Sequence, residues 1–210
     1  MNDQVPKLPG DPDHDLVARA RGGDFAAFEA LVGRYEGRVY RLAQRMVNET
    51  HDAEEVVQET FLSVLEHLAQ FREEASFRTW LLRIATNEAL QLLRKRRGLK
   101  TVSFGGDDQD EPLPHPEFIA PWQDDPALLA HRGEIRHLLD EALRDLDEKY
   151  RAVFVLRDME ELSTEETAEA LQITPANVKV RLMRARLMLR ERLTQALGDA
   201  VQAAPPHRHP

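Results

Sequence analysis

Positively charged side chains gather near the carboxyl end of the sequence, at spacings that suit contact with phosphate. Residues 179–192 hold six basic residues against one acidic residue, Glu191, which gives the segment a net charge of +5. Apolar residues recur between them at steps of four, three and four: Val178, Leu182, Ala185 and Leu189. A helix would bury these on one face and leave basic side chains on the others, as reading a DNA major groove requires. The basic candidates are Lys179, Arg181, Arg184 and Arg186.

Two capping signals predict that this helix is the second of a helix-turn-helix. Ser163 and Glu166 have the spacing of a capping box, which starts a short helix. Thr174 followed by Pro175 then starts the basic helix, because threonine caps well and proline suits the first helical position. The alternative is an ordinary helical hairpin with a solvated basic face. The caps and the charge together favour the helix-turn-helix.

A second basic cluster, Arg94-Lys95-Arg96-Arg97, ends a helix that the pattern predicts from 77 to 97. A basic helix end alone is ordinary, since cations complement the helix dipole. Here, however, it follows aromatic residues, arginines and an amide, which suit single-stranded bases: rings stack, an amide reads a base edge and arginines bind phosphate. We expect Phe71 to stack, Asn87 to meet a base edge and Trp80 to belong to the core. From the residues alone, a purely structural role for the aromatic residues is an equal alternative.

The overall composition limits the classes of protein that this chain can be. It has 210 residues and no cysteine, which excludes disulfides, thiolate nucleophiles and cysteine-bound zinc. The longest apolar runs, such as residues 153–156, are far too short to span a bilayer. The first fifteen residues are acidic and contain three prolines, unlike a signal or transit peptide. We therefore predict a cytoplasmic protein.

The negative charge is concentrated in one stretch of the sequence. Residues 105–126 contain seven acidic residues and no lysine or arginine, so they supply −7 of the net charge of −9. Five prolines between 112 and 126 exclude a long helix there, and a connection of this length is unusual inside one compact domain. We interpret the stretch as a linker. Basic segments on either side of it can each meet phosphate although the whole chain is acidic.

Helical periodicity covers nearly all of the remaining sequence, and no alternating strand pattern is found. The prediction is an all-α protein with two small helical domains joined by an acidic, proline-rich linker, the C-terminal domain being a helix-turn-helix. We place the domains at 15–98 and 132–198, the linker at 99–131, and disordered ends at 1–14 and 199–210. Within the first domain, Asp52 is the expected N-cap of a helix, with Glu55 at the capping-box position.

The segments Asp52 to Arg97 and Leu143 to Leu193 resemble the extracytoplasmic-function group of bacterial sigma factors, in the order and spacing of that family. The matching motifs include FRTWLLRIATNEALQLLRKRR and STEETAEALQITPANVKVRLMRARL. In this family, two helical domains bind core RNA polymerase through its beta and beta-prime subunits. The first domain melts and reads the −10 promoter element, and the second reads the −35 element as duplex. The resemblance implies an initiation factor with no enzymatic activity and no cofactor.

The resemblance also implies roles for individual positions. Phe71 and Asn87 would hold a flipped-out base of the −10 element, with Ile84 and Ala85 lining its pocket. The full set implied at −10 is Phe71, Arg83, Ile84, Ala85, Asn87, Arg94, Lys95, Arg96 and Arg97. The set implied at −35 is Arg157, Lys179, Arg181, Met183, Arg184 and Arg186. The set implied at the clamp of the largest polymerase subunit is Asp52, Glu55, Gln58, Glu59 and Phe61.

Three positions depart from the family pattern. Val180 replaces a frequent serine, which removes one contact to DNA, and Thr167 replaces a core isoleucine. Glu88 sets an acid beside the implied base pocket, which leaves the preferred −10 base open. The resemblance further implies that Asp107 to Glu111 of the linker lie in the path of nascent RNA, a solvated spacer being the alternative.

Partners and rival functions complete the expectations. Most relatives are inhibited by an anti-sigma protein, often membrane-anchored, so such a partner is implied beside polymerase and promoter DNA, without membrane insertion of this chain. An enzyme is one rival, but a di-iron bundle needs two Glu-x-x-His motifs plus partner glutamates, and the sequence has one such motif, Glu134-x-x-His137. A helix-turn-helix regulator independent of polymerase would leave residues 52–97 without a use. A mimic that sequesters an anti-sigma protein would not need the basic residues.

Overall fold

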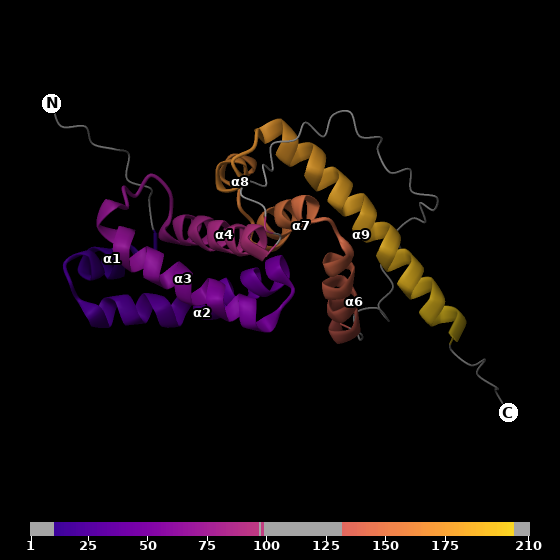
Figure 1. Cartoon of the computed structure of the whole chain (residues 1–210), viewed down its shortest axis with the longest axis horizontal. Helices are drawn as coiled ribbons and strands as arrows, with labels where there is room; N and C mark the ends of the chain where they lie inside the picture. The colour runs from indigo at the N-terminus through magenta and orange to yellow at the C-terminus, as the bar shows by residue number, and fades with distance from the viewer. Residues whose placement is uncertain (1–10, 97, 99–131, 204–210) are drawn as a thin grey trace.

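A computed structural model describes residues 11–96, 98 and 132–203, and this part of the chain is helical, with no strand (Figure 1). The all-α prediction is thereby confirmed. The first domain contains α1 (His14–Arg21), α2 (Phe25–Val47), α3 (Thr50–His67), the 3-10 turn η1 (Leu68–Gln70) and α4 (Phe77–Arg96). The second contains α6 (Arg132–Asp145), α7 (Glu148–Phe154), the π turn η3 (Val155–Met159), α8 (Thr164–Leu171) and α9 (Pro175–Ala203).

Local capping explains where the helices of the first domain begin. The Asp24 carboxylate accepts a hydrogen bond from the Ala27 N–H at 3.1 Å and starts α2. The Ser76 hydroxyl accepts one from the Thr79 N–H at 3.1 Å and starts α4. Helix α3 begins at Thr50 rather than after Asp52, and its N-cap, Glu49, makes no side-chain cap bond. The expected Asp52 cap is wrong because that carboxylate lies inside the helix and accepts a hydrogen bond from Arg96.

The core of the first domain lies where α2, α3 and α4 meet. Leu31 and Leu42 of α2 and Phe77 of α4 are at most 1% exposed. Burial of side chains of this size stabilises the fold by about 1.5–3 kcal/mol each. This packing holds α3 and α4 side by side, and the gap between them becomes the site described below.

Residues before α1 belong to this fold, although we expected disorder through residue 14. Asp13 is 1% exposed, and its carboxylate accepts hydrogen bonds from Arg34 and from the Tyr35 hydroxyl. Burial, together with that hydrogen bond, raises the pKa of Tyr35, so its hydroxyl remains protonated. The Asp11 carboxylate accepts a hydrogen bond from the Phe77 N–H at 2.8 Å. Buried polar partners far along the sequence therefore order this segment.

The second domain contains the predicted helix-turn-helix. In the capping box of α8, the Ser163 hydroxyl accepts from the Glu166 N–H at 3.0 Å, and the Glu166 carboxylate accepts from the Ser163 N–H at 2.7 Å. Gln172 ends α8 in the left-handed conformation at φ 54°. The Thr174 hydroxyl then accepts a hydrogen bond from the Asn177 N–H at 3.2 Å at the start of α9. Both predicted caps are confirmed.

The two domains pack against each other, with α8 beside α4 and the α7–η3 segment beside α2 (Figure 1). Arg38 Nε donates to the Glu160 carboxylate at 2.6 Å, and Arg151 Nη2 donates to the Met46 carbonyl at 2.8 Å. Buried apolar residues of both domains, Leu156 among them, form one continuous cluster. The sequence pattern, which indicated two separate domains, did not predict this contact.

Several expectations fall on residues outside the described ranges. These are the linker at 99–131 with Asp107 to Glu111, the side chains of Arg97 and Glu134, and the ends at 1–10 and 204–210. Helix α9 is described as far as Ala203, so the helical part extends past the expected boundary at 198. None of the helices described has the length and apolar character needed to cross a bilayer.

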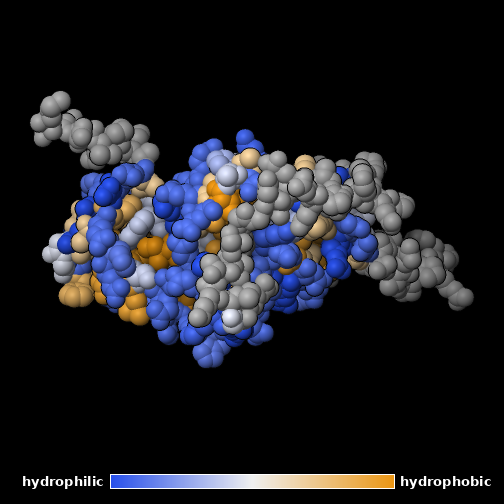
Figure 2. Space-filling view, turned by 45° about the horizontal axis from the view of Figure 1, so that its top comes forward, coloured by the Kyte–Doolittle hydropathy of each residue, from blue (hydrophilic) through white to orange (hydrophobic). Residues whose placement is uncertain are grey.

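Some large apolar side chains of the described residues are exposed at the surface. On the face drawn in Figure 2, hydrophilic residues predominate, and apolar colour gathers at the end of the molecule where α2 begins. Among large apolar side chains, those of Phe25, Leu62, Leu65 and Met183 are exposed.

Candidate nucleic-acid interface

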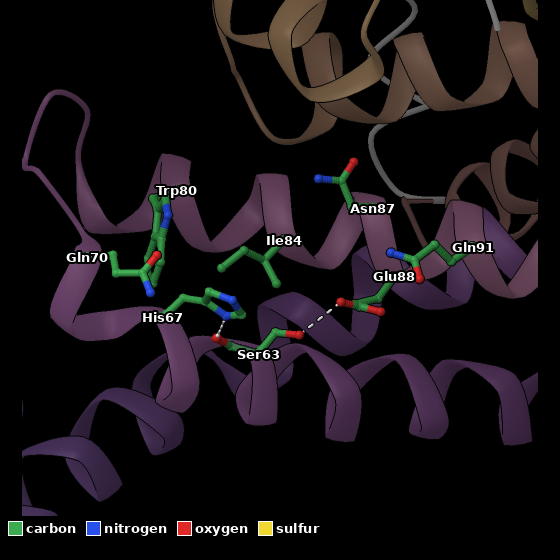
Figure 3. A pocket seen from close by; sticks show the side chains of 8 residues that line it. All are labelled: Ser63, His67, Gln70, Trp80, Ile84, Asn87, Glu88 and Gln91. Carbon is green, nitrogen blue, oxygen red and sulfur yellow. Dashed lines mark hydrogen bonds between the residues drawn. The ribbon is translucent and has the colours of Figure 1, made fainter. Parts of the chain in front are cut away.

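A pocket of about 350 Å³ lies between α3 and α4, at the place where the resemblance implies a −10 base site (Figure 3). Its walls consist of side chains from α3, η1 and α4: Ser63, His67, Gln70, Trp80, Ile84, Asn87, Glu88 and Gln91. Except for the neighbours 87 and 88, the lining positions of each helix follow one another at intervals of three or four residues. Each helix therefore turns one face toward the pocket. The combination of an aromatic ring, an aliphatic side chain and several amides suits a planar, polar ligand.

Two hydrogen bonds fix one wall of the pocket. The Ser63 hydroxyl donates to Glu88 Oε1 at 2.9 Å and joins α3 to α4 (Figure 3). His67 Nδ1 lies 2.8 Å from the Ser63 carbonyl oxygen. Because a carbonyl oxygen only accepts hydrogen bonds, Nδ1 carries the proton of that bond.

The structure brings some of the residues expected at −10 into the pocket and excludes others. Ile84 and Asn87 line it. Phe71 does not: it is 5% exposed, with its ring centroid 4.8 Å from that of Trp80. Ala85 is fully buried in the core beneath. We expected Phe71 to be an exposed stacking residue and Trp80 to belong to the core, and the structure corrects both expectations. Phe71 packs inward against Phe77, whereas Trp80 lies at the surface of the pocket.

The polar residues contributed by α3 were missed in the sequence. Ser63 and His67 are four residues apart and share the helix face that α4 covers. Two polar residues on a helix face that packs against another helix were the signal that the sequence offered. We missed it because we identified the packing face of this helix from its apolar residues alone.

A second groove, of about 460 Å³, adjoins the pocket and shares two of its lining residues, Glu88 and Gln91. The residues that line it are Glu55, Val56, Glu59, Glu88, Gln91, Leu92, Arg94 and Lys95. It therefore brings together residues expected at the polymerase clamp and residues expected at the −10 phosphates. The pocket and the groove form one continuous depression along α3 and α4.

Two residues expected at different interfaces form one ion pair. Arg96 Nη2 lies 2.5 Å from Asp52 Oδ1, and the Asp52 side chain is 4% exposed. Asp52 thus does not present its carboxylate at the surface, which corrects its expected role as a direct clamp contact. Gln58 is exposed and Phe61 is half-buried on the same helix, where both can contribute to a protein contact.

Arg83, expected at −10, forms an ion pair with the second domain. Its Nη2 lies 2.6 Å from Glu169 Oε1 of α8. The neighbouring Thr79 hydroxyl donates to Glu166 Oε1 at 2.9 Å. Burial raises the pKa of Glu166, but hydrogen bonds from Ser163 and Thr79 outweigh it and leave that pKa below its ordinary value. Acidic side chains of α8 therefore cover a basic part of α4.

The residues expected at −35 are divided between exposed and covered positions. Lys179 and Met183 are exposed on one face of α9. Arg186 shares this face, but it donates two hydrogen bonds to Asp158, at 2.6 and 2.8 Å, which raise the pKa of its guanidinium. Arg181 and Arg184 are only 1% and 2% exposed.

Two further contacts explain why covered arginines do not face solvent. Arg184 Nη1 lies 3.4 Å from the Tyr150 hydroxyl of α7. Half-buried Arg157 donates to the Leu162 carbonyl oxygen. The expectation that all six side chains form one solvent-facing surface is wrong, because residues of the second domain itself hold Arg184 and Arg157.

Known families match both domains. Residues 31–98 match the family model of sigma-70 region 2, and residues 136–189 match that of sigma-70 region 4. The RNA polymerase sigma-H factor of Pseudomonas aeruginosa is 31% identical over 193 residues, which cover 92% of this chain and all of that protein. The ECF RNA polymerase sigma factor SigW of Bacillus subtilis is 30% identical and covers 84% of this chain and 94% of its own.

Solved structures with the same fold include two complexes. CnrH, solved in complex with the cytosolic domain of CnrY, is 27% identical with a TM-score of 0.57, over 90% of this chain and 99% of that one. The sigma factor RpoE of Bartonella quintana, solved with the anti-sigma factor NepR, has a TM-score of 0.57 at 23% identity, over 80% of this chain and 96% of its own. The second comparison supports the fold alone.

Proposed function

The chain belongs to the extracytoplasmic-function group of the sigma-70 family, and we propose that it binds core RNA polymerase, through the beta and beta-prime subunits, and directs it to promoters with −10 and −35 elements of its own. It acts in the cytoplasm as an initiation factor, without catalysis or a cofactor. The observation that carries this proposal is the pocket between α3 and α4, which lies within the region 2 match and adjoins a groove lined by Arg94 and Lys95.

The pocket supports promoter melting by capture of an extruded base. Removing a base from the stack costs a few kcal/mol. Trp80 offers a ring face for stacking, and Asn87 offers an amide for the base edge. Arg94 and Lys95, at the far end of the depression, attract the strand's phosphates. Contacts made only with the extruded base thus stabilise the melted state.

The second domain supports duplex reading through α9. Lys179 and Met183 are already presented, whereas Arg184 is buried and Arg186 is bound to Asp158. We propose that the domains separate on polymerase, which releases Arg83 from Glu169 and allows α9 to enter the major groove. Held together on one enzyme, the two weak DNA sites then act as an intramolecular pair.

Two protein contacts complete the proposal. Gln58, Glu59 and Phe61 of α3, with Glu55 at the groove, meet the polymerase clamp, while Asp52 anchors Arg96 behind them. An anti-sigma protein holds the factor inactive until a signal removes it. CnrH, a relative solved with the cytosolic domain of CnrY, supports a partner of this kind.

Run-off transcription with purified core polymerase tests the proposed function. We expect start-site-selective transcripts only when the chain is present. A regulator independent of polymerase would bind duplex DNA without core and would not change initiation by core alone. A mimic that only sequesters an anti-sigma protein would bind neither core nor DNA. If core enzyme accepts the chain but gains no selectivity, the proposed function is wrong.

A further inference from the structure

We propose that Glu88, held in place by Ser63, selects the chemistry of the base that enters the pocket: a base with an exocyclic amino group is accepted and thymine is disfavoured. This inference rests on the proposed function, because it assumes that the pocket receives an extruded promoter base. It adds the residue that sets the choice and the kind of base edge that fits.

The position of Glu88 is fixed more firmly than that of its polar neighbours. One carboxylate oxygen accepts the Ser63 hydroxyl at 2.9 Å, which ties Glu88 of α4 to the facing helix α3. The other oxygen has no hydrogen bond among the residues described. No arginine, lysine or histidine in the described part of the chain forms an ion pair with Glu88. A full negative charge therefore stands at the pocket wall with one acceptor oxygen available.

The remaining polar groups are less selective. Gln70, Asn87 and Gln91 are exposed amides. An amide both donates and accepts, and it can turn to suit either kind of partner. These three side chains can thus each adapt to the edge of more than one base. A carboxylate only accepts, so Glu88 is the group in the pocket whose preference no rotation can reverse.

Nucleobases differ in whether they carry an exocyclic amino group that can donate to Glu88. Cytosine, adenine and guanine each carry an amino group that donates two hydrogens, whereas thymine has carbonyl oxygens beside its single ring N–H. Those oxygens would face the Glu88 carboxylate and repel it. The same charge also repels phosphate, so Glu88 is unsuited to binding the strand's backbone and suited to a base edge.

The experiment recovers promoters from a random library. Holoenzyme is assembled from core polymerase and the full chain, and templates randomised across the −35 and −10 windows are sequenced after recovery from heparin-resistant open complexes. For the wild type, we expect one −10 position at which thymine is depleted roughly tenfold against an amino-bearing base. Glu88→Gln, which can also donate, should bring thymine to within about twofold at that position alone. The frequencies of the other three bases identify which amino-bearing base is bound.

A matched control separates selection from general charge. Glu66→Gln removes an exposed carboxylate of α3 that lines neither the pocket nor the groove, and it should leave every base frequency unchanged. Thymine as the preferred base, an unchanged profile in Glu88→Gln, or the same change in Glu66→Gln would each overturn the inference. Loss of enrichment at all positions in Glu88→Gln also overturns it, since Glu88 would then serve folding or polymerase binding.

The test also distinguishes the two proposals from each other. If the wild-type chain enriches no template above core enzyme alone, the proposed function fails. If templates are enriched but no position depends on Glu88, the function stands and this inference fails. Ser63 supplies a second variant set, since it acts by positioning Glu88. Ser63→Ala should weaken the thymine depletion by about threefold, and Ser63→Thr, which retains the hydroxyl, should restore it.

Discussion

The two DNA-facing regions differ in how ready they are to bind. The depression along α3 and α4 is open, with Trp80 and Asn87 already at its walls. On α9, by contrast, Arg184 is buried and Arg186 is bound to Asp158. The −10 site is thus shaped by the core of its own domain and is open, whereas the −35 surface is partly covered by Tyr150 and Asp158, which belong to the second domain itself. The arginines of α9 therefore have to exchange contacts within their own domain before they can meet DNA.

The largest expected effect is a loss of stability in the first domain, whose core shapes the pocket. Phe77 is fully buried beneath Trp80, so Phe77→Ala should lower the free energy of unfolding by about 3–5 kcal/mol. Urea denaturation followed by circular dichroism measures it. Phe25→Ala is the control, because Phe25 is 78% exposed and the change should stay within about 0.5 kcal/mol. Equal effects of the two changes would contradict the packing described.

The next effect tests the contact between the domains. Glu160 is 4% exposed and accepts from Arg38, so Glu160→Gln should weaken the closed arrangement by about 1.5–3 kcal/mol. Small-angle scattering of the full chain should then report a larger radius of gyration. Glu161→Gln alters the exposed neighbouring acid and should leave the radius unchanged. An unchanged radius in Glu160→Gln would show that the apolar cluster and the other polar contacts, such as Arg83–Glu169, are enough to hold the two domains together.

A third prediction separates exposed from covered residues on α9. Lys179→Ala and Arg184→Ala should each weaken −35-dependent promoter binding by holoenzyme by about 1–3 kcal/mol. Only Arg184→Ala should also change the thermal stability of the free chain, because Arg184 is buried and Lys179 is exposed. Filter binding and thermal melting measure the two properties. If both variants melt alike, Arg184 is not covered in solution.

The smallest expected effect is a loss of folding stability at acidic pH. The pKa of Glu166 is lowered from its ordinary value of 4.5 in the folded chain. A lowered pKa contributes stability above the unfolded-state value, and this contribution disappears as the pH falls through the folded-state value. Below about pH 4.5, the α8 cap and its bond to Thr79 should therefore weaken. Glu166→Gln should reduce the slope of stability against pH in this range, and an identical slope would contradict the assignment.

The local signals of the second domain were readable in the sequence because they involve near neighbours, whereas the expected Asp52 cap failed because its carboxylate binds the distant Arg96. The Ser163–Glu166 box and the Thr174 cap each span three residues, and both occur as expected. Asp13 could not be placed in this way, since its partner Tyr35 lies 22 residues further along the chain. Sequence distance alone hides such a contact.

The site was predictable only in part for the same reason. Ile84 and Asn87 follow from one helix face and do line the pocket. Phe71 and Trp80 exchange their expected places, because two rings in one cluster differ only in which of them packs against Phe77. The burial of Arg184 likewise depends on the tertiary arrangement, which no helical period reveals.

The ion pair between Arg96 and Asp52 has a consequence for the order of assembly. Asp52 lies on α3, which we propose meets polymerase, and Arg96 lies at the end of α4, which we propose binds the strand. Under that proposal, a phosphate that binds Arg96 would leave the buried Asp52 carboxylate without its cation, and the start of α3 would have to rearrange. Thermodynamic reciprocity then requires polymerase bound to α3 to change the affinity for the strand by the same factor by which the strand changes the affinity for polymerase.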